Sequence, residues 1–173
     1  MDLREEVLKE HSKKNITRIV DWVGEDPQKF DQLMRLFLGD EYRITQRAAW
    51  VVGDCTVRYP ELIKPHLKKI IGNLHKPIHE AVKRNTVRIF EVIDIPEEFK
   101  GEVLDICFQC LEDGKEAVAV KAYALTVCFN IAKEQPELLR ELKILIEDQL
   151  PYAPASFRSR AVKMLRWMEK MKI

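Results

Sequence analysis

The stretch YPELIKPHLKKIIGNLHKP, residues 59–77, contains three prolines and still has the apolar spacing of a helix. Its apolar side chains recur every three or four residues, at Leu62, Ile63, Leu67, Ile70, Ile71 and Leu74. A proline is tolerated in the first turn of a helix, because the N–H that it lacks would have no intrahelical partner there. We therefore predict a helix over about 60–75, with Pro65 near its first turn.

Helices are predicted along the rest of the chain as well. Asp26 and Pro27 are typical of an N-cap and a first helical position, and Gly39 ends the helix that they begin. The other helices are expected over 2–23 (as one helix or two), 41–59, 78–94, 96–112, 116–134, 136–150 and 155–171. No segment alternates apolar and polar residues between hairpin turns, so the predicted fold class is all-α.

A cation recurs at one position of four predicted helices, within ITQRAAWV, AVKRNTVR, VAVKAYAL and RSRAVKML. The cations are Arg47, Arg84, Lys121 and Arg160, and their separations are 37, 37 and 39 residues. The second helix of each pair begins near a proline, at Pro60, Pro96 and Pro136. This period predicts a helical hairpin made four times and stacked so that neighbouring hairpins share a core.

Two of these motifs resemble those of a known family. TQRAAW (45–50) and AVKAYAL (119–125) are similar to the V-R-x-A-A-A pattern in the first helix of a HEAT repeat, and IKPHLKKII (63–71) is similar to the L-x-P-x-L-x-x-L-L pattern of its second helix. The resemblance implies a right-handed α-solenoid of about four HEAT-like hairpins plus a terminal helix, forming one domain over 1–173. An armadillo-type arrangement stays open.

The expected shared core is made of apolar side chains from successive helices. Truncation of a large one to alanine should cost roughly 2–5 kcal/mol of stability. The expected members are Phe37, Ala48, Val52, Leu67, Ile71, Ile89, Phe90, Leu104, Phe108, Ala122, Leu125, Phe129, Leu142, Leu145, Ala161 and Leu165.

The near-equal numbers of basic and acidic residues argue against a highly charged partner. The chain has 29 Lys and Arg against 28 Asp and Glu, a net charge of +1, so no overall field draws it to nucleic acid or to an anionic membrane. The four cysteines lie in apolar, helix-like contexts typical of reduced, buried thiols, and no apolar stretch resembles a signal peptide. We expect a cytoplasmic protein that does not bind membranes.

Catalytic and cofactor motifs are not evident. The chain has three serines, none in a nucleophile-elbow context, and neither a G-x-G-x-x-G nor a P-loop pattern. The lone C-x-x-C of CFQC (107–110) lacks further ligands at metal-binding spacing. We predict a protein that is not an enzyme and that has no metal or other cofactor.

The recurring cations Arg47, Arg84, Lys121 and Arg160 allow two interpretations. They could form a ridge that binds an acidic partner or a phosphate backbone. Alternatively, each could pair with an acid of its own repeat, as Asp40 with Arg47 or Asp113 with Lys121, and the HEAT resemblance implies such a structural ladder. The structural interpretation is favoured, because ion pairs on helix surfaces are common.

Trp50 and Asp54 lie one helical turn apart, and Arg88 follows 34 residues after Asp54. This set is similar to that of the alkylpurine DNA glycosylases built from HEAT-like repeats. The similarity implies that the Asp stabilises a sugar cation, the Trp stacks on a base and the Arg holds a phosphate. The alternative is ordinary packing by Trp50 and a surface role for Asp54, which the near-neutral charge favours.

The second helices of successive predicted hairpins carry charges of opposite sign. Lys64, Lys68 and Lys69 make one of them basic, and Glu98, Glu102 and Asp105 make the next acidic. A phosphate-tracking surface would keep one sign, so the pattern favours a protein or peptide partner of mixed charge over nucleic acid. A solvated surface without a partner is the alternative.

The basic C-terminal segment 155–173 interleaves six cations with Trp167, Met168 and Met171. It either caps the array or docks a partner, a membrane surface or a second copy of the chain, and capping is favoured because the last helix of a solenoid needs a polar outer surface. The function predicted from the sequence is therefore an interaction scaffold, with a DNA-binding or glycosylase-like protein as the alternative.

Overall fold

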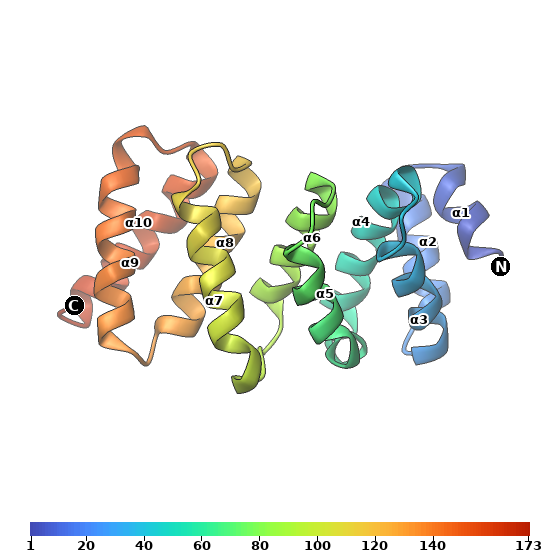
Figure 1. Ribbon diagram of the computed structural model, residues 1–173, viewed down its shortest axis with the longest axis horizontal. Coiled ribbons are helices and arrows are strands. Elements are labelled where there is room, and N and C mark those ends of the chain that lie inside the picture. The colour runs from blue at the N-terminus through green and yellow to red at the C-terminus, as the bar shows by residue number, and fades with distance from the viewer. The chain divides into compact units, whose positions relative to one another are not determined.

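The computed structural model describes residues 1–173, and every regular element in it is helical (Figure 1). The α-helices are α1 (Leu3–Lys9), α2 (Lys13–Val23), α3 (Pro27–Phe37), α4 (Tyr42–Arg58), α5 (Leu67–Leu74), α6 (Glu80–Val92), α7 (Glu97–Glu112), α8 (Val118–Ala132), α9 (Pro136–Gln149) and α10 (Ala155–Lys170). Two 3₁₀ helices, η1 (Pro60–His66) and η2 (Leu150–Tyr152), complete the fold. The all-α prediction is confirmed, and the segment predicted over 2–23 forms two helices.

Helix starts follow from capping side chains. Ser12 accepts a hydrogen bond from the Asn15 N–H at the start of α2, and Asp26 accepts from two N–H groups at the start of α3. Pro27 occupies the first position of α3, as predicted. These caps lie just before the apolar runs and fix where each helix begins.

The chain forms two compact units, Met1–Asp94 and Ile95–Ile173. In the first unit, α4 is the central helix and packs against α2, α3 and α6. Its inward face is built of small side chains, including Ala48, Ala49 and Cys55, all of which have no exposed surface. Small residues at this position let three neighbouring helices approach α4 closely.

In the second unit, α8 is the central helix and packs against α7, α9 and α10. Apolar residues occur on all sides of α8, as expected of a helix surrounded by others. Leu125, Val127 and Cys128 have no exposed surface. The predicted single domain and the handedness of the array stay predictions.

Pro65 does not lie where the sequence predicted. It falls inside η1, and the α-helix that was expected to contain it begins only at Leu67. A proline removes an N–H donor, and Pro60 and Pro65 together leave this stretch short of the bonds that an α-helix needs. The residues between them form the tighter 3₁₀ helix instead.

Most of the expected core residues are buried. Phe108, Leu145 and Leu165 are the exceptions, because their side chains are partly exposed. They lie on α7, α9 and α10, the outer helices of the second unit, whereas the predicted core residues on α8 are all buried. None of the helices combines the length with the apolar composition that a membrane span requires.

Candidate functional site

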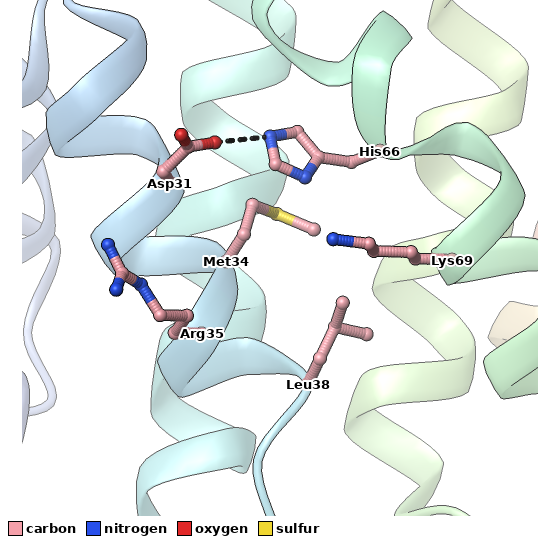
Figure 2. A pocket seen from close by; sticks show the side chains of 6 residues that line it. All are labelled: Asp31, Met34, Arg35, Leu38, His66 and Lys69. Carbon is pink, nitrogen blue, oxygen red and sulfur yellow. Dashed lines mark ion pairs between the residues drawn. The ribbon is translucent and has the colours of Figure 1, made fainter.

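A pocket of about 470 Å³ opens in the first unit between α3 and the η1–α5 segment. Its lining residues are Asp31, Met34, Arg35, Leu38, His66 and Lys69, and we call it the His66 pocket (Figure 2). The residues at 31, 34 and 35 on α3 and the C-cap residue Leu38 follow a three- and four-residue spacing and therefore lie on one side of this helix. The η1–α5 segment supplies the opposite wall.

One side of the pocket is formed by the contact between His66 and Asp31. His66 Nε2 lies 2.9 Å from Asp31 Oδ1, and the His66 side chain is only 12% exposed, whereas that of Asp31 is 54% exposed. The His66 ring also meets Phe30 edge-on, with 5.6 Å between the ring centroids. Asp31 and Phe30 therefore hold the imidazole in one orientation.

Burial lowers the pKa of His66 below its ordinary value, because the charged imidazolium loses hydration. Lys69 acts in the same direction, and Asp31 opposes both by favouring the charged ring. At neutral pH the imidazole is thus largely uncharged. The positive charge around the pocket then comes from Arg35 and Lys69.

The rest of the pocket combines an apolar floor with exposed cations. Met34 is buried, and Figure 2 shows the Lys69 ammonium pointing across the pocket toward the Met34 methyl group, with Leu38 beside them. Lys68 and Lys64 extend the basic surface along η1 and α5, although Lys64 pairs with Glu61 at 2.7 Å. Such a surface can hold an apolar group and a carboxylate together.

The sequence predicted Lys64, Lys68 and Lys69 as contact residues but missed His66, Asp31 and Arg35. Nothing local in the sequence indicates a role for His66, because its partner lies 35 residues earlier on another helix. The spacing of Asp31, Arg35 and Leu38 along one face of α3 was the available indication of a mixed polar and apolar wall.

The acidic candidates Glu98, Glu102 and Asp105 lie on α7 in the second unit, and all three are exposed. Nearby, Glu97 and Lys100 pair at 2.6 Å. The acidic face of α7 is therefore accessible to a partner. Its predicted role in binding stays a prediction.

The structure brings Trp50, Asp54 and Arg88 to one place in the first unit. Asp54 Oδ1 lies 3.4 Å from Arg88 Nη1, and the Asp54 side chain is only 13% exposed. Lys13 on α2, which the sequence did not indicate, reaches Asp54 Oδ2 at 2.5 Å and lies 5.8 Å from the centre of the Trp50 ring. Asp54 thus carries two cationic partners and is not a simple surface acid.

The recurring cations do not pair with the expected acids. Arg47 donates to the carbonyls of Val7 and Leu8 in the last turn of α1, and Lys121 donates to the Leu111 carbonyl near the end of α7 at 2.9 Å. The predicted contacts with Asp40 and Asp113 are therefore not formed. The last carbonyls of a helix have no intrahelical partner and attract cations, which explains why Arg47 and Lys121 bind carbonyls rather than acids.

The other two recurring cations differ. Arg160 donates to the Thr126 hydroxyl at 2.5 Å and lies over the Tyr123 ring at 5.1 Å. Arg84 makes neither a hydrogen bond nor an ion pair and is partly exposed. Three of the four cations therefore join neighbouring helices, two of them through carbonyls near a helix end and the third through a hydroxyl and an aromatic ring.

All four cysteines are free and buried. Burial raises the pKa of Cys55 to about 12, and the neighbouring Asp54 charge adds to the effect. The pKa of Cys107 is raised as well, by a hydrogen bond with Cys128 and by burial. No three His, Cys, Asp or Glu side chains come together in an arrangement that could hold a metal ion.

A family model described as a HEAT repeat domain matches residues 3–167. No curated protein and no solved structure matches the chain. The matched residues include every helix from α1 to α9 and most of α10. The chain is a member of the HEAT repeat domain family.

Proposed function

We propose that this HEAT repeat protein is a non-enzymatic scaffold that binds a peptide segment of a partner protein, and that the His66 pocket receives an acidic part of that segment. The observation that carries the proposal is the combination of an apolar floor, Met34 and Leu38, with the cations of Arg35 and Lys69 in one pocket. A glutamate or aspartate beside a leucine-sized side chain matches both features.

The charges of the surrounding surface support this choice of partner. Arg35, Lys68 and Lys69 are exposed and form no ion pair within the chain, so their charges are available to a ligand. Asp31 is the one acid in the lining, and the two cations Arg35 and Lys69 outnumber it. Electrostatic matching of this kind contributes more to partner choice and association rate than to affinity.

The test uses a short fluorescein-labelled peptide of glutamate, leucine and serine, with a peptide of lysine, leucine and serine for comparison. Fluorescence anisotropy should show binding of the acidic peptide only. The double substitution Arg35→Glu and Lys69→Glu should weaken binding by about tenfold or more, because two attractive contacts become repulsive.

A matched control carries the same charge change elsewhere in the first unit. Lys14 is exposed on α2 and lies outside the pocket, and so does Lys9 on α1, so Lys9→Glu with Lys14→Glu should leave most of the affinity intact. Equal losses in the two double variants would contradict the pocket as the binding site. Binding of both peptides alike would contradict the choice of an acidic segment.

A second candidate function is binding of duplex DNA through Trp50, Asp54 and Arg88, as in a base-lesion glycosylase. The proximity of Asp54 and Arg88 at 3.4 Å favours it, and the contact of Lys13 with Asp54 counts against a free carboxylate. Titration of the protein with duplex DNA at low salt tests this candidate. Low salt is needed because phosphate contacts weaken steeply as the salt concentration rises. Absence of binding at high micromolar protein removes this candidate.

The remaining expectations concern the setting of the protein. Four free thiols support a reducing compartment, such as the cytoplasm. Association of two copies through the terminal repeats would appear in sedimentation at several concentrations as a mass that rises with concentration. We propose no cofactor and no membrane partner.

A further inference from the structure

A second pocket, of about 500 Å³, lies wholly within the second unit. It is formed where α7 and α9 end and where α8 and α10 begin, and we call it the Tyr152 pocket. The residues that carry the following inference are Glu112, Val118, Asp148, Tyr152, Pro154 and Phe157.

Two hydrogen bonds hold the base of the Tyr152 pocket. Lys121 Nζ and Gln149 Nε2 both donate to the carbonyl oxygen of Leu111, at 2.9 Å and 2.8 Å. These bonds tie α8 and α9 to the end of α7. The Lys121 ammonium is thereby directed to a carbonyl and forms no ion pair with the acids of the pocket.

Two acids of the pocket, Glu112 and Asp148, are open to a ligand. Glu112 and Asp148 are exposed and make neither an ion pair nor a hydrogen bond through their side chains. They come from the last turns of α7 and α9, where the helix dipole disfavours negative charge. A cation that reached both would relieve this unfavourable placement.

Large apolar surface lies beside these acids. The Tyr152 side chain is 91% exposed and Val118 is 46% exposed, and both line the pocket. Phe157 is buried behind them, and Pro154 stiffens the connection into α10. The pocket therefore offers an aromatic ring, an aliphatic wall and two carboxylates to the same ligand.

We propose that the Tyr152 pocket binds an arginine or lysine side chain of a partner peptide. The aliphatic stem of such a side chain packs on Val118 and Tyr152, and its charged head reaches Glu112 and Asp148. The Tyr152 ring adds attraction for a cation over its face. This site lies in the other unit from the His66 pocket, so it does not depend on the function proposed above.

The test uses N-acetyl-arginine amide as the probe and N-acetyl-norleucine amide as its uncharged counterpart. NMR spectra of the full ¹⁵N-labelled chain should show saturable shifts at the amides of Val118, Gln149 and Tyr152 with the arginine probe at about 10 mM or below, the range of weak single-side-chain affinity. The uncharged probe should leave these resonances in place.

Two variants and a matched control complete the experiment. Glu112→Gln with Asp148→Asn should weaken binding of the arginine probe by about fivefold, and Tyr152→Ala should weaken it by a similar factor. Glu137→Gln with Glu141→Gln removes the same charge from exposed positions outside the pocket and should change little. All of these residues are exposed, so the fold should survive the substitutions.

Three results would overturn the proposal. The first is the absence of saturable shifts at the pocket, and the second is an equal response to the uncharged probe. The third is an equal loss of binding in the pocket variant and the control variant. Failure of the acidic-peptide experiment at the His66 pocket would leave all three measurements unaffected.

Discussion

At the scale of single residues, the second unit depends on one buried carbonyl. The oxygen of Leu111 accepts from Lys121 and from Gln149, and Leu111 itself has no exposed surface. A carbonyl has two lone pairs, so the two donors do not compete for one place. Loss of either donor leaves the oxygen satisfied, whereas loss of both leaves it without a partner.

We therefore predict strong coupling between Lys121→Met and Gln149→Met. Each single substitution should lower the free energy of unfolding by about 1 kcal/mol, and the double variant should lose about 1 kcal/mol more than the sum. Urea unfolding of the four proteins measures this cycle. Strictly additive losses would show that the two donors act independently.

His66 should make stability depend on pH. Its pKa in the folded chain lies below the unfolded value of about 6.5, so the unfolded chain binds the proton more readily. The stability that neutral His66 allows is fully present above the unfolded pKa. It is lost as the pH falls from there through the lower pKa of the folded chain. Between about pH 7 and pH 5 the wild type should lose more stability than His66→Asn. Parallel pH profiles would contradict a lowered pKa.

The four buried thiols should resist alkylation. Burial raises the pKa of Cys55 to about 12, so the reactive thiolate is scarce, and the other three thiols are also enclosed. Iodoacetamide should label the native chain far more slowly than the urea-unfolded chain, as mass spectrometry would show. Rapid labelling of Cys107 or Cys110 without denaturant would show that α7 opens readily.

At the scale of elements, Gly53 allows α4 and α6 to pack closely. A Cβ atom at this position would lie 3.3 Å from Asn85 Oδ1 and 3.5 Å from Arg88 Nη1. Asn85 cannot move freely, because its Nδ2 donates to the Ala81 carbonyl at 2.8 Å. The contact between the two helices therefore depends on the missing side chain.

Gly53→Val should lower stability by about 1–3 kcal/mol, since the added methyl groups press on Asn85 and Arg88. Gly72 on α5 provides the control, because a Cβ there would meet nothing within 4 Å. Gly72→Val should be neutral or mildly stabilising. Thermal unfolding of both variants measures the difference, and equal melting temperatures would contradict the close packing of α4 and α6.

The elements were largely predictable from the sequence, and the η1 segment shows where prediction failed. Apolar spacing, caps and prolines are local features, so they indicated α3, α4 and the helices from α6 to α10 within a few residues, whereas α5 begins seven residues later than predicted. Pro65 was placed in an α-helix because its neighbours have helical spacing, yet spacing does not distinguish an α-helix from a short 3₁₀ segment.

At the scale of the whole molecule, the functional surfaces were less predictable than the helices. The His66 pocket depends on a contact between residues 31 and 66, and the Tyr152 pocket on the ends of four helices. Neither contact has a local sequence pattern, because side chains on different helices meet only after packing. The resemblance to HEAT-like glycosylases did single out Trp50, Asp54 and Arg88, and Asp54 and Arg88 do meet, but nothing in the sequence indicated Lys13.

The linings of the two pockets differ in charge, since cations outnumber acids in the His66 pocket and acids outnumber cations in the Tyr152 pocket, and each pocket lies within its own unit. A partner of mixed charge therefore fits the chain better than a uniformly charged polymer. The function of the whole molecule then depends first on whether the His66 pocket receives an acidic peptide.

The most direct measurement follows the methyl group of Met34, which lies at the floor of the His66 pocket beside Lys69 (Figure 2). In ¹³C-methyl NMR spectra, the acidic glutamate–leucine peptide should shift the Met34 resonance in a saturable way. The resonances of Met164 and Met168, in the second unit, should not move. Binding of the peptide with an unmoved Met34 resonance, or no binding at all, would contradict the proposed function.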